Sequence, residues 1–507
     1  MFLKLLFKFT FTTFLFFGIT FVVSGQSRSA ELPDTTLSRM MREWFQTIEA
    51  GKEDEIKRFV ETRFSANALR SQPDAAQMFR KVYEQSGGLE IVQVTPPAGE
   101  FPMAILAKSK RGEHYVRITV GTDNFEKEKL AGLGVDRTEN PAIPKLSEIN
   151  QSLSDAEMIA AVKREIERRA AAKDFSGVVL LAKDDRILLQ TAHGLADVEN
   201  KIPNSMETKF HLASTGKMFT AVAVAQLVKA GKMSYEDTVA KLLPDFPNQE
   251  MARKITVHQL LTHTAGMGTF FGSPGYDENR TFRRSTEEIS VYENEKLYFE
   301  PGARWRYSNA GYSLLGAIIE RVSEKTYLEY VRENIFKPLK MRDTDTNQPD
   351  EIAKGAAILY TQSPADPLGI EAFTPNRKIL KSHATGFGDG SATALDLFKF
   401  ARAYRTGKLL GRATTEQIAT GKISDSDKGD SRWGYGIRER IINDSIVRGH
   451  SGGGRTDVQM LWENGYTVIV QTNRVPLPAT ALSNEIIAFL TKQLKMRGES
   501  KMNNQKN

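Results

Sequence analysis

The stretch HLASTGKMFT, residues 211–220, decides the fold, because it places a serine and a lysine at the start of a helix. Ser214 precedes Lys217 by three positions, and an apolar, helix-like run follows directly. Residues three apart lie on one helix face, so the hydroxyl and the amine come within reach of each other. An amine whose charge is penalised by its surroundings can take the serine proton, and a helix N-terminus favours the negative charge that develops there. The pattern predicts a serine nucleophile at Ser214 with Lys217 as its first proton partner.

The Ser-x-x-Lys spacing alone is weak, since a chain of 507 residues should contain about one or two such pairs by chance. Ser214 is the only serine of this sequence with a lysine three residues on. The alternative is a helix N-cap serine followed by a surface lysine. Two later segments weigh against that alternative.

A Tyr-x-Asn and a glycine-rich strand edge follow further along the chain. Tyr307-Ser308-Asn309 comes after the turn EPG (300–302) and before the apolar helical run 310–319. HSGGG (450–454) stands between two strand-like runs. A competing Tyr-x-Asn at 292–294 has no preceding Pro-Gly turn and no following apolar helix, so it is rejected.

In order, spacing and flanks, the three motifs resemble those of the β-lactamase-like serine hydrolases. These include class C β-lactamases, low-molecular-weight penicillin-binding proteins, D-aminopeptidases and related esterases. The resemblance covers residues 151–495 and implies an α+β fold, in which an antiparallel sheet of five or more strands packs against helices. A mainly helical subdomain covers one end, and the active site lies in the groove between them.

The resemblance also assigns roles to the residues of the motifs. Ser214 is the nucleophile and Lys217 its first proton partner, while Tyr307 is expected to act as base and then acid. A phenol near an ammonium can be held partly as phenolate. Asn309 is expected to orient Lys217 and to bind a substrate carbonyl. The backbone N–H groups of Ser214 and Gly453 are expected to form the oxyanion hole.

The third motif departs from the antibiotic-hydrolysing pattern. Class C β-lactamases and many penicillin-binding proteins carry Lys-Thr-Gly where this chain has His450-Ser451-Gly452, and His-x-Gly resembles D-aminopeptidases and their peptidase or esterase relatives. Histidine is a weaker anchor for a carboxylate than lysine, which argues against a dedicated β-lactamase. His450 is expected among the catalytic residues. Ser451, Gly452 and Gly453 are expected to bind substrate along the cleft edge, where glycines let substrate backbone approach. The alternative for His450 is a turn histidine at a strand end.

Composition excludes several classes of function. The chain is 40% hydrophobic and 26% charged, and its net charge of +7 is spread along the sequence without a basic run interleaved with aromatics, so nucleic acid is not an expected partner. The absence of cysteine excludes disulfides, thiolate metal sites and cysteine nucleophiles. The seven histidines show no metal-binding spacing, and His258 and His263 are interpreted as structural residues at a helix end. No metal and no cofactor are therefore expected.

The N-terminus is predicted to be a signal peptide over residues 1–25. Lys4 and Lys8 give the positive start, residues 9–23 are apolar, and Val23-Ser24-Gly25 offers small residues for cleavage. The alternative is an uncleaved anchor; either way the protein is expected outside the cytoplasm, secreted or periplasmic. The basic balance is compatible with association with an acidic cell envelope.

Residues 31–137 are predicted to form a separate small α+β domain. Helices are expected at 34–50, 53–62 and 75–85, followed by strands at 89–94, 103–109 and 114–120. This order of elements resembles that of nuclear-transport-factor-2-like domains. The domain is expected to dock the enzyme or to present its substrate, and the alternative is that it has only a structural role. A linker at 137–144 leads to the hydrolase domain at 151–495, and a disordered tail at 497–507 ends the chain.

The function predicted from these motifs is an extracytoplasmic serine hydrolase that cleaves peptide or ester bonds of a small-molecule or peptide substrate through an acyl-enzyme on Ser214. The alternative within enzymes is a β-lactamase or DD-carboxypeptidase. A reading from another class is a non-catalytic envelope-binding receptor. Loss of Ser214, Lys217 or Tyr307 would have favoured the receptor, and all three are present.

Overall fold

The computed structural model describes residues 31–498 except 97–102, 113, 124–125, 127, 139, 271–281, 345–352, 363–365, 367–372, 378–384, 426–428 and 476–478. The predicted signal peptide at 1–25 and most of the predicted tail at 497–507 lie outside the described residues. The chain divides into two compact units. Among the described residues, one comprises 146–359 and 376–498, and the other comprises 31–145 and 360–375.

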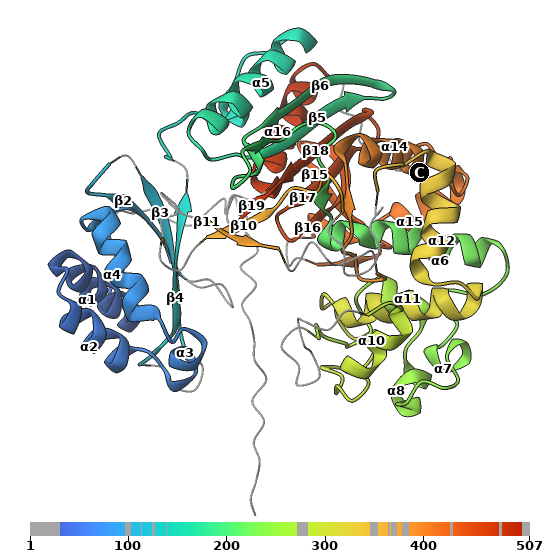
Figure 1. Cartoon of the computed structure of the whole chain (residues 1–507), viewed down its shortest axis with the longest axis horizontal. Helices are drawn as coiled ribbons and strands as arrows, with labels where there is room; N and C mark the ends of the chain where they lie inside the picture. The colour runs from blue at the N-terminus through green and yellow to red at the C-terminus, as the bar shows by residue number, and fades with distance from the viewer. Residues whose placement is uncertain are drawn as a thin grey trace, which may run out of the picture. The chain divides into compact units, whose positions relative to one another are not determined.

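Four helices precede a four-stranded sheet in the N-terminal unit (Figure 1). They are α1 (Thr36–Ala50), α2 (Glu53–Arg63), α3 (Ala66–Ser71), α4 (Ala75–Ser86), β1 (Leu89–Thr95), β2 (Met103–Ser109), β3 (Tyr115–Thr122) and β4 (Leu130–Thr138). The strands lie in chain order, and every neighbouring pair is antiparallel. Trp44 and Phe79 of the helices join Ile118 of the sheet in one apolar core. The likeness to nuclear-transport-factor-2-like domains stays a prediction.

Two elements of this unit, α3 and β4, were not predicted from the sequence. Strand β4 contains Gly132 and Gly134, which weaken a strand pattern because they add no side chain and lose more backbone freedom on pairing. It runs to Thr138 and so occupies the first residues of the predicted linker. Helix α3 is only six residues long, too short for a clear helical period.

An eight-stranded antiparallel sheet forms the centre of the larger unit, in the order β13-β14-β15-β16-β17-β18-β5-β6. The strands are β5 (Gly177–Lys183), β6 (Arg186–His193), β13 (Ile423–Ser424), β14 (Ser431–Trp433), β15 (Arg438–Ile442), β16 (Ser445–Gly452), β17 (Thr456–Leu461) and β18 (Tyr466–Thr472). The hairpin β5–β6 from the start of the unit pairs through β5 with the late meander through β18. The architecture confirms the predicted α+β, β-lactamase-like fold class.

Helices cover both faces of this sheet. Because successive side chains of a strand point to opposite faces, Val178 and Leu180 of β5 pack toward α6, α11 and α14, whereas Val179 and Leu181 pack toward α5 and α16. The five helices are α5 (Asp155–Ala171), α6 (Lys217–Lys229), α11 (Asn309–Ser323), α14 (Ala394–Arg405) and α16 (Ala479–Met496). Because both faces of β5 are buried, its sequence is a nearly continuous run of apolar residues.

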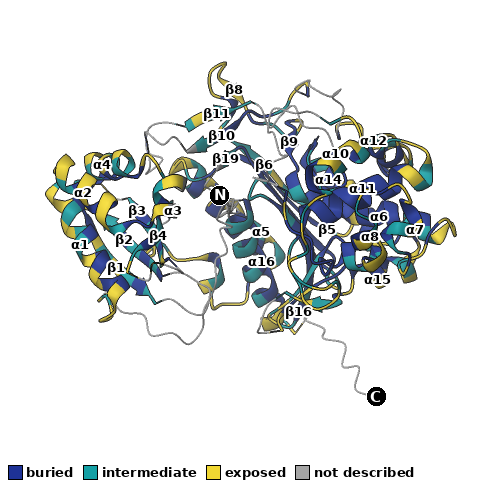
Figure 2. Ribbon diagram, turned by 90° about the horizontal axis from the view of Figure 1, so that it is seen from below, coloured by how far each residue is buried: buried dark blue, intermediate teal, exposed yellow. Residues whose placement is uncertain are grey.

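Helix α6 is buried on nearly all sides, as its dark colour in Figure 2 shows. Its buried residues are apolar except for Lys217 and Thr220. A helix that is apolar all round has to lie inside the domain rather than on its surface. The helix therefore carries the one lysine at its start into the interior, and that lysine defines the site described below.

Shorter elements complete the unit. Its remaining helices are α7 (Val239–Leu242), α8 (Gln249–Lys254), α9 (Val257–Leu261), α10 (Ser285–Tyr292), α12 (Tyr327–Val331), α13 (Lys337–Leu339) and α15 (Arg412–Ala419), with helical turns at 146–148, 213–216 and 332–336. Its short strands are β7 (Leu195–Asp197), β8 (Ile202–Pro203), β9 (Phe210–His211), β12 (Ser391–Ala392) and β19 (Arg474–Val475). The strands β10 (Leu359–Gln362) and β11 (Phe373–Asn376) lie almost entirely in the segment 360–375, which belongs to the N-terminal unit. Within the described ranges, no helix is both long and apolar enough to span a membrane.

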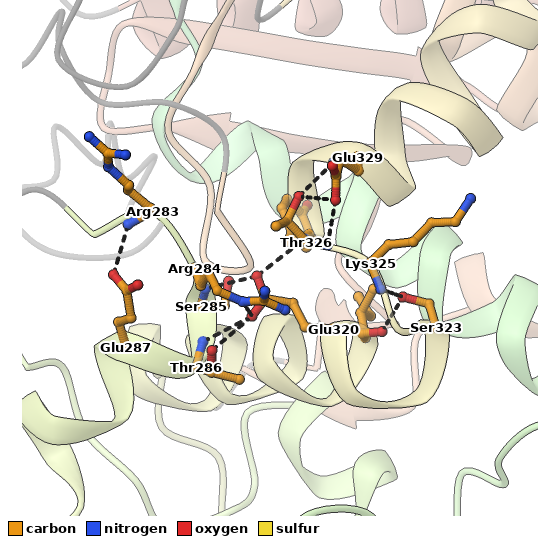
Figure 3. Close-up of polar contacts among 12 residues, drawn as sticks. Arg283, Arg284, Ser285, Thr286, Glu287, Glu320, Ser323, Lys325, Thr326 and Glu329 are labelled. Carbon is orange, nitrogen blue, oxygen red and sulfur yellow. Dashed lines mark hydrogen bonds and ion pairs between the residues drawn. The ribbon is translucent and has the colours of Figure 1, made fainter.

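A buried glutamate ties two helix starts together in the helical subdomain (Figure 3). The Glu320 carboxylate, on α11, accepts hydrogen bonds from the backbone N–H groups of Ser285 (3.0 Å) and Thr286 (3.2 Å) at the start of α10. It also accepts from the N–H of Tyr327 at the start of α12, at 3.0 Å. N–H groups of a helix's first turn have no partner within the helix, and a carboxylate there is favoured by the helix dipole.

Replacing Glu320 should destabilise the fold. Glu320→Ala leaves three N–H groups without their acceptor in a buried site, so unfolding in urea should show a loss of about 3 kcal/mol. Glu333→Ala, which removes a surface glutamate paired with Lys325, should lose less than about 1 kcal/mol. Equal losses in the two variants would contradict the anchoring role of Glu320.

Candidate active site

The turn that carries Ser214 is held in place by a distant glycine-rich segment. The turn lies between β9 and α6. The N–H of Leu212 donates to the carbonyl of Gly390 at 2.9 Å, and the N–H of Asp389 donates to the carbonyl of Ala213 at 3.0 Å. Ala213 has a φ of 46°, a left-handed conformation that is strained for a residue with a side chain. Strain next to a candidate nucleophile, held by bonds on both sides, is typical of a functional turn.

Lys217 lies one turn after Ser214, as the spacing predicts. Its Nζ lies 3.2 Å from Ser214 Oγ and 2.8 Å from Asn309 Oδ1, and it also donates to the carbonyl of Phe387. The side chain is fully buried. The structure therefore brings together the serine, the lysine and the asparagine of two motifs 92 residues apart.

Burial changes the protonation of this amine. It lowers the pKa of Lys217 from 10.5 to about 7, and the negative charge of Asp389 opposes part of the change. A neutral amine has two N–H groups and one lone pair. The Asn309 Oδ1 and Phe387 carbonyl oxygens can only accept, so they take the two N–H groups. The lone pair is then left for the hydroxyl of Ser214.

Asn309 begins α11, and its amide is held from both sides. Its oxygen accepts from Lys217, and its Nδ2 donates to the hydroxyl of Thr269 at 3.3 Å. Ser308 caps the helix, since its hydroxyl accepts from the N–H of Gly311 at 2.8 Å. The hydroxyl also donates to the carbonyl of Gly268 at 2.9 Å. The Tyr-x-Asn motif therefore ends in a capped helix start that fixes the asparagine.

Tyr307 lies beside the serine and the lysine. Lys217 Nζ is 5.1 Å from the centre of the Tyr307 ring. The Tyr307 hydroxyl is buried and has no partner at full hydrogen-bond geometry among the described residues, although Ser214 lies close enough to act on its pKa. Burial raises the pKa of Tyr307 above its ordinary value, and Ser214 only partly opposes this. The expectation of a partial phenolate is therefore wrong: the site keeps the phenol protonated.

The rejected Tyr-x-Asn at 292–294 occupies a different environment. Tyr292 ends α10, and its hydroxyl lies 3.1 Å from the hydroxyl of Ser313. Ser313 in turn donates to the buried carboxyl of Glu288. Burial raises the pKa of Glu288 to about 8, so this carboxyl is largely protonated at neutral pH. The described residues give Tyr292 no contact with Ser214 or Lys217.

His450 lies within strand β16 rather than at a turn. Its Nδ1 lies 2.8 Å from the carbonyl of Ser451, and because a carbonyl can only accept, the proton belongs on Nδ1. Nε2 is buried and has no partner among the described residues. Burial, followed by the charge of Lys217, lowers the pKa of His450 to about 3. The ring is thus neutral at physiological pH and offers Nε2 as an acceptor.

The neighbours of His450 divide between the two faces of the strand. The Ser451 hydroxyl lies 2.6 Å from the hydroxyl of Thr480 on α16, so the structure does not bring this predicted substrate-binding side chain to the site. Alternation along the strand explains this, because His450 and Ser451 are adjacent. A Cβ on Gly452 would lie 1.9 Å from the carbonyl of Leu212, so this glycine admits protein backbone rather than substrate. Gly453 lies beside the same turn, where its Cβ would be 3.7 Å from that of Ala213.

The glycine-rich segment at 385–391 is a part of the site that was not predicted from the sequence. It supplies the Phe387 carbonyl to Lys217 and the Gly386 carbonyl to Thr220, the latter at 2.7 Å. A Cβ on Gly388 would lie 2.2 Å from the carbonyl of Ala213, so only glycine permits this approach. The pattern GFGDG was visible in the sequence, but its contribution comes through backbone atoms.

Asp389 of that segment adds a negative charge near the amine. Its carboxylate lies 3.2 Å from His211 Nε2. Burial acts to raise the pKa of Asp389, but His211, Arg455 and Lys217 outweigh it and hold the pKa below the ordinary value. Asp389 is therefore ionised and stabilises the protonated form of Lys217.

Neither of the two histidines near α9 belongs to a metal cluster. The part of the chain that the structure describes contains no group of three or more histidine, aspartate or glutamate side chains placed to hold an ion. His258 Nδ1 lies 2.7 Å from the hydroxyl of Tyr435. His263 Nδ1 accepts from the N–H of Ser308 at 3.1 Å.

A family model and several known proteins are similar to this chain. The model of the family described as Beta-lactamase matches residues 162–492. A penicillin-binding protein of Bacillus subtilis strain 168 is 31% identical over 293 residues, which cover 55% of this chain and 63% of that protein. The chain thus spans less than two thirds of the length of this curated relative.

Solved structures share the fold. A penicillin-binding protein from Bacillus halodurans superposes with a TM-score of 0.56 at 27% identity, covering 65% of this chain and 98% of that one. A D-amino acid amidase from Ochrobactrum anthropi SV3 gives a TM-score of 0.56 at 22% identity, covering 68% and 99%. The second likeness, at that identity, shows the fold alone.

The buried amine should titrate near neutrality. In protein labelled with nitrogen-15 at lysine, one side-chain resonance should show a midpoint near pH 7 and should be missing from Lys217→Ala. Asp389→Asn should lower that midpoint, because it removes the negative charge that favours the ammonium. A midpoint near the ordinary value of lysine, or a rise in Asp389→Asn, would contradict this description.

Proposed function

We propose that this chain, which belongs to the beta-lactamase family, is a serine hydrolase that cleaves peptide or ester bonds through an acyl-enzyme on Ser214. The single observation that carries the proposal is the buried amine of Lys217, 3.2 Å from the Ser214 hydroxyl and occupied on its other sides by two acceptors. A neutral amine in this position is a general base aimed at one hydroxyl.

The first half of the reaction transfers the serine proton. As Ser214 Oγ attacks the substrate carbonyl carbon, its proton passes to Lys217 Nζ, and the carbonyl oxygen becomes an oxyanion. Asp389 supports the ammonium that forms, since its negative charge raises the pKa of Lys217. We assign the oxyanion hole to the backbone N–H groups of Ser214 and Gly453. The closeness of Gly453 to Ala213 supports this assignment.

The second half protonates the leaving group. Burial keeps the Tyr307 phenol protonated, so it acts as a donor to the leaving nitrogen or oxygen and then recovers a proton from Lys217. As the bond between the carbonyl carbon and the leaving atom breaks, the leaving group takes the Tyr307 proton, the proton that came from Ser214 replaces it on the phenol, and the amine returns to its neutral form. Water then takes the place of the leaving group: it attacks the acyl-enzyme, and the same proton transfers run in the opposite direction. The acid is released and the Ser214 hydroxyl is restored. Asn309 holds the amine in place through these steps.

The protonation state of His450 affects which substrates the site can bind. A neutral ring cannot attract a carboxylate by charge, whereas a lysine at the same place would. The substrate class we propose is therefore a neutral ester or small peptide. The second candidate, a β-lactamase or DD-carboxypeptidase, is favoured by one observation, namely that the curated relatives carry penicillin-binding names.

Two further parts of the proposal rest on the sequence. The apolar stretch at 9–23 with Lys4 and Lys8 supports an extracytoplasmic location, and the net charge of +7 supports contact with an acidic envelope. The N-terminal unit is proposed to dock the enzyme or present its substrate.

Ser214→Ala should abolish hydrolysis and covalent labelling by a serine-directed phosphonate while leaving the thermal unfolding temperature unchanged. The matched control is Ser290→Ala, which removes an exposed serine of α10 and should be labelled like the wild type. Mass spectrometry of the labelled peptide checks both. Wild-type labelling of Ser214→Ala would refute the assignment of the nucleophile.

His450→Lys should shift preference toward substrates that carry a carboxylate. A charge-assisted bond in a partly desolvated cleft contributes about 1–3 kcal/mol, or about 5-fold to 150-fold in relative specificity. The measurement is the ratio of kcat/KM for a cephalosporin to that for a neutral ester. Gln190→Lys, which adds the same charge on exposed β6, should leave the ratio unchanged. Efficient cephalosporin turnover by the wild type would favour the second candidate instead.

A further inference from the structure

His263 contacts the chain on both sides of Tyr307. Its carbonyl accepts a hydrogen bond from the N–H of Arg306 at 2.9 Å, and its Nδ1 accepts from the N–H of Ser308 at 3.1 Å. Its ring stacks on the ring of Tyr307, with 4.4 Å between centres and an angle of 33° between planes. One residue thus binds the backbone before and after Tyr307 and packs against the side chain between them.

The protonation state of His263 follows from these bonds. A nitrogen that accepts from the N–H of Ser308 carries no proton, so the neutral ring has its proton on Nε2. Burial, with smaller contributions from the charges of Lys217 and His450, holds the pKa of His263 well below its ordinary value. The ring therefore stays neutral at physiological pH and places no second cation beside Lys217.

Local structure does not require a histidine at this position. His263 follows the end of α9 with a φ of 60°, in the left-handed region, which glycine adopts at no steric cost. The side chain is fully buried, and its Nε2 has no hydrogen-bond partner among the described residues. A turn alone needs none of these features, so the imidazole has to be explained by what it contacts.

Other rings keep the imidazole from moving. Tyr312 and Trp433 each lie 4.9 Å from it, centre to centre, and Trp305 lies at 6.3 Å. Trp433 also contacts the ring of His450 at 5.3 Å. His263 is therefore fixed in a packed aromatic cluster, and any residue that it holds is fixed with it.

We propose that His263 is a positioning residue for Tyr307, setting the place of the phenol hydroxyl relative to Ser214 and Lys217. The proposal rests on the proposed function, because it presupposes that Tyr307 relays the proton to the leaving group. It assigns to the His-Thr-Ala-Gly turn at 263–266 a part in catalysis that acts entirely through another residue.

A double-mutant cycle tests this dependence. The rate of acylation by a chromogenic ester is measured for His263→Ala, Tyr307→Phe and the double variant. His263→Ala should lower the rate about 100-fold with KM unchanged, because Tyr307 loses its alignment and not its substrate. In the Tyr307→Phe background the same change should have almost no further effect on the rate.

His263→Asn serves as the conservative variant. The asparagine oxygen can accept from the N–H of Ser308 in place of Nδ1, and asparagine tolerates a positive φ. The stacking on Tyr307 is lost, so the rate should fall about 10-fold, midway between wild type and His263→Ala. This loss should also vanish in the Tyr307→Phe background. The cycle therefore does not depend on the alanine variant folding.

The possible results separate the two claims. Losses that multiply in the double variants, or a rise in KM with kcat unchanged, would overturn the positioning role of His263. An asparagine variant no better than a folded alanine variant would also overturn it. A full rate in Tyr307→Phe alone would instead refute the proton relay of the proposed function. Non-additive losses with rescue by asparagine support the proposal.

Discussion

The burial of one lysine amine is the constraint on which the rest of the site depends. The amine of Lys217 has no exposed surface, and its pKa falls from 10.5 to about 7. A change of this size corresponds to about 5 kcal/mol of lost preference for the charged form. The apolar faces of α6 create the low-polarity environment, and Asn309 and Phe387 provide the acceptors that make burial tolerable. The same desolvation leaves the Lys217 amine, which would be protonated in water at pH 7, partly neutral at that pH.

The groups around that amine are arranged so that few charges compete with it. His263 and His450 are both held neutral by burial, and Tyr307 is held protonated for the same reason. Asp389 is the ionised neighbour, and its charge limits how far the amine is neutralised. Protonation in the site thus varies chiefly at one nitrogen near neutral pH. A single amine that titrates near pH 7, beside neutral donors and acceptors and one fixed carboxylate charge, suits repeated proton transfer.

Sequence patterns predicted which side chains meet at the candidate site but not the backbone that supports them. Ser214 and Lys217 were found from helix geometry, and Tyr307 with Asn309 from the turn before and the helix after them. The Phe387 carbonyl was missed because a backbone acceptor has no residue signature, and strand β4 because Gly132 and Gly134 blur its period. Ser451 was assigned to the wrong face, although alternation along β16 beside His450 contained the information. The partial phenolate failed because burial raises the pKa of Tyr307 by more than the contact with Ser214 lowers it.

The central claim is that Lys217 is the base that activates Ser214, and the pH dependence of acylation tests it most directly. The pre-steady-state acylation rate of the wild type should rise with pH through a single ionisation near 7 and level off above it, since only the neutral amine accepts the proton. The midpoint should equal that of the Lys217 amine, and in Lys217→Ala the ionisation should disappear together with most of the rate. An unchanged ionisation in Lys217→Ala would contradict the account.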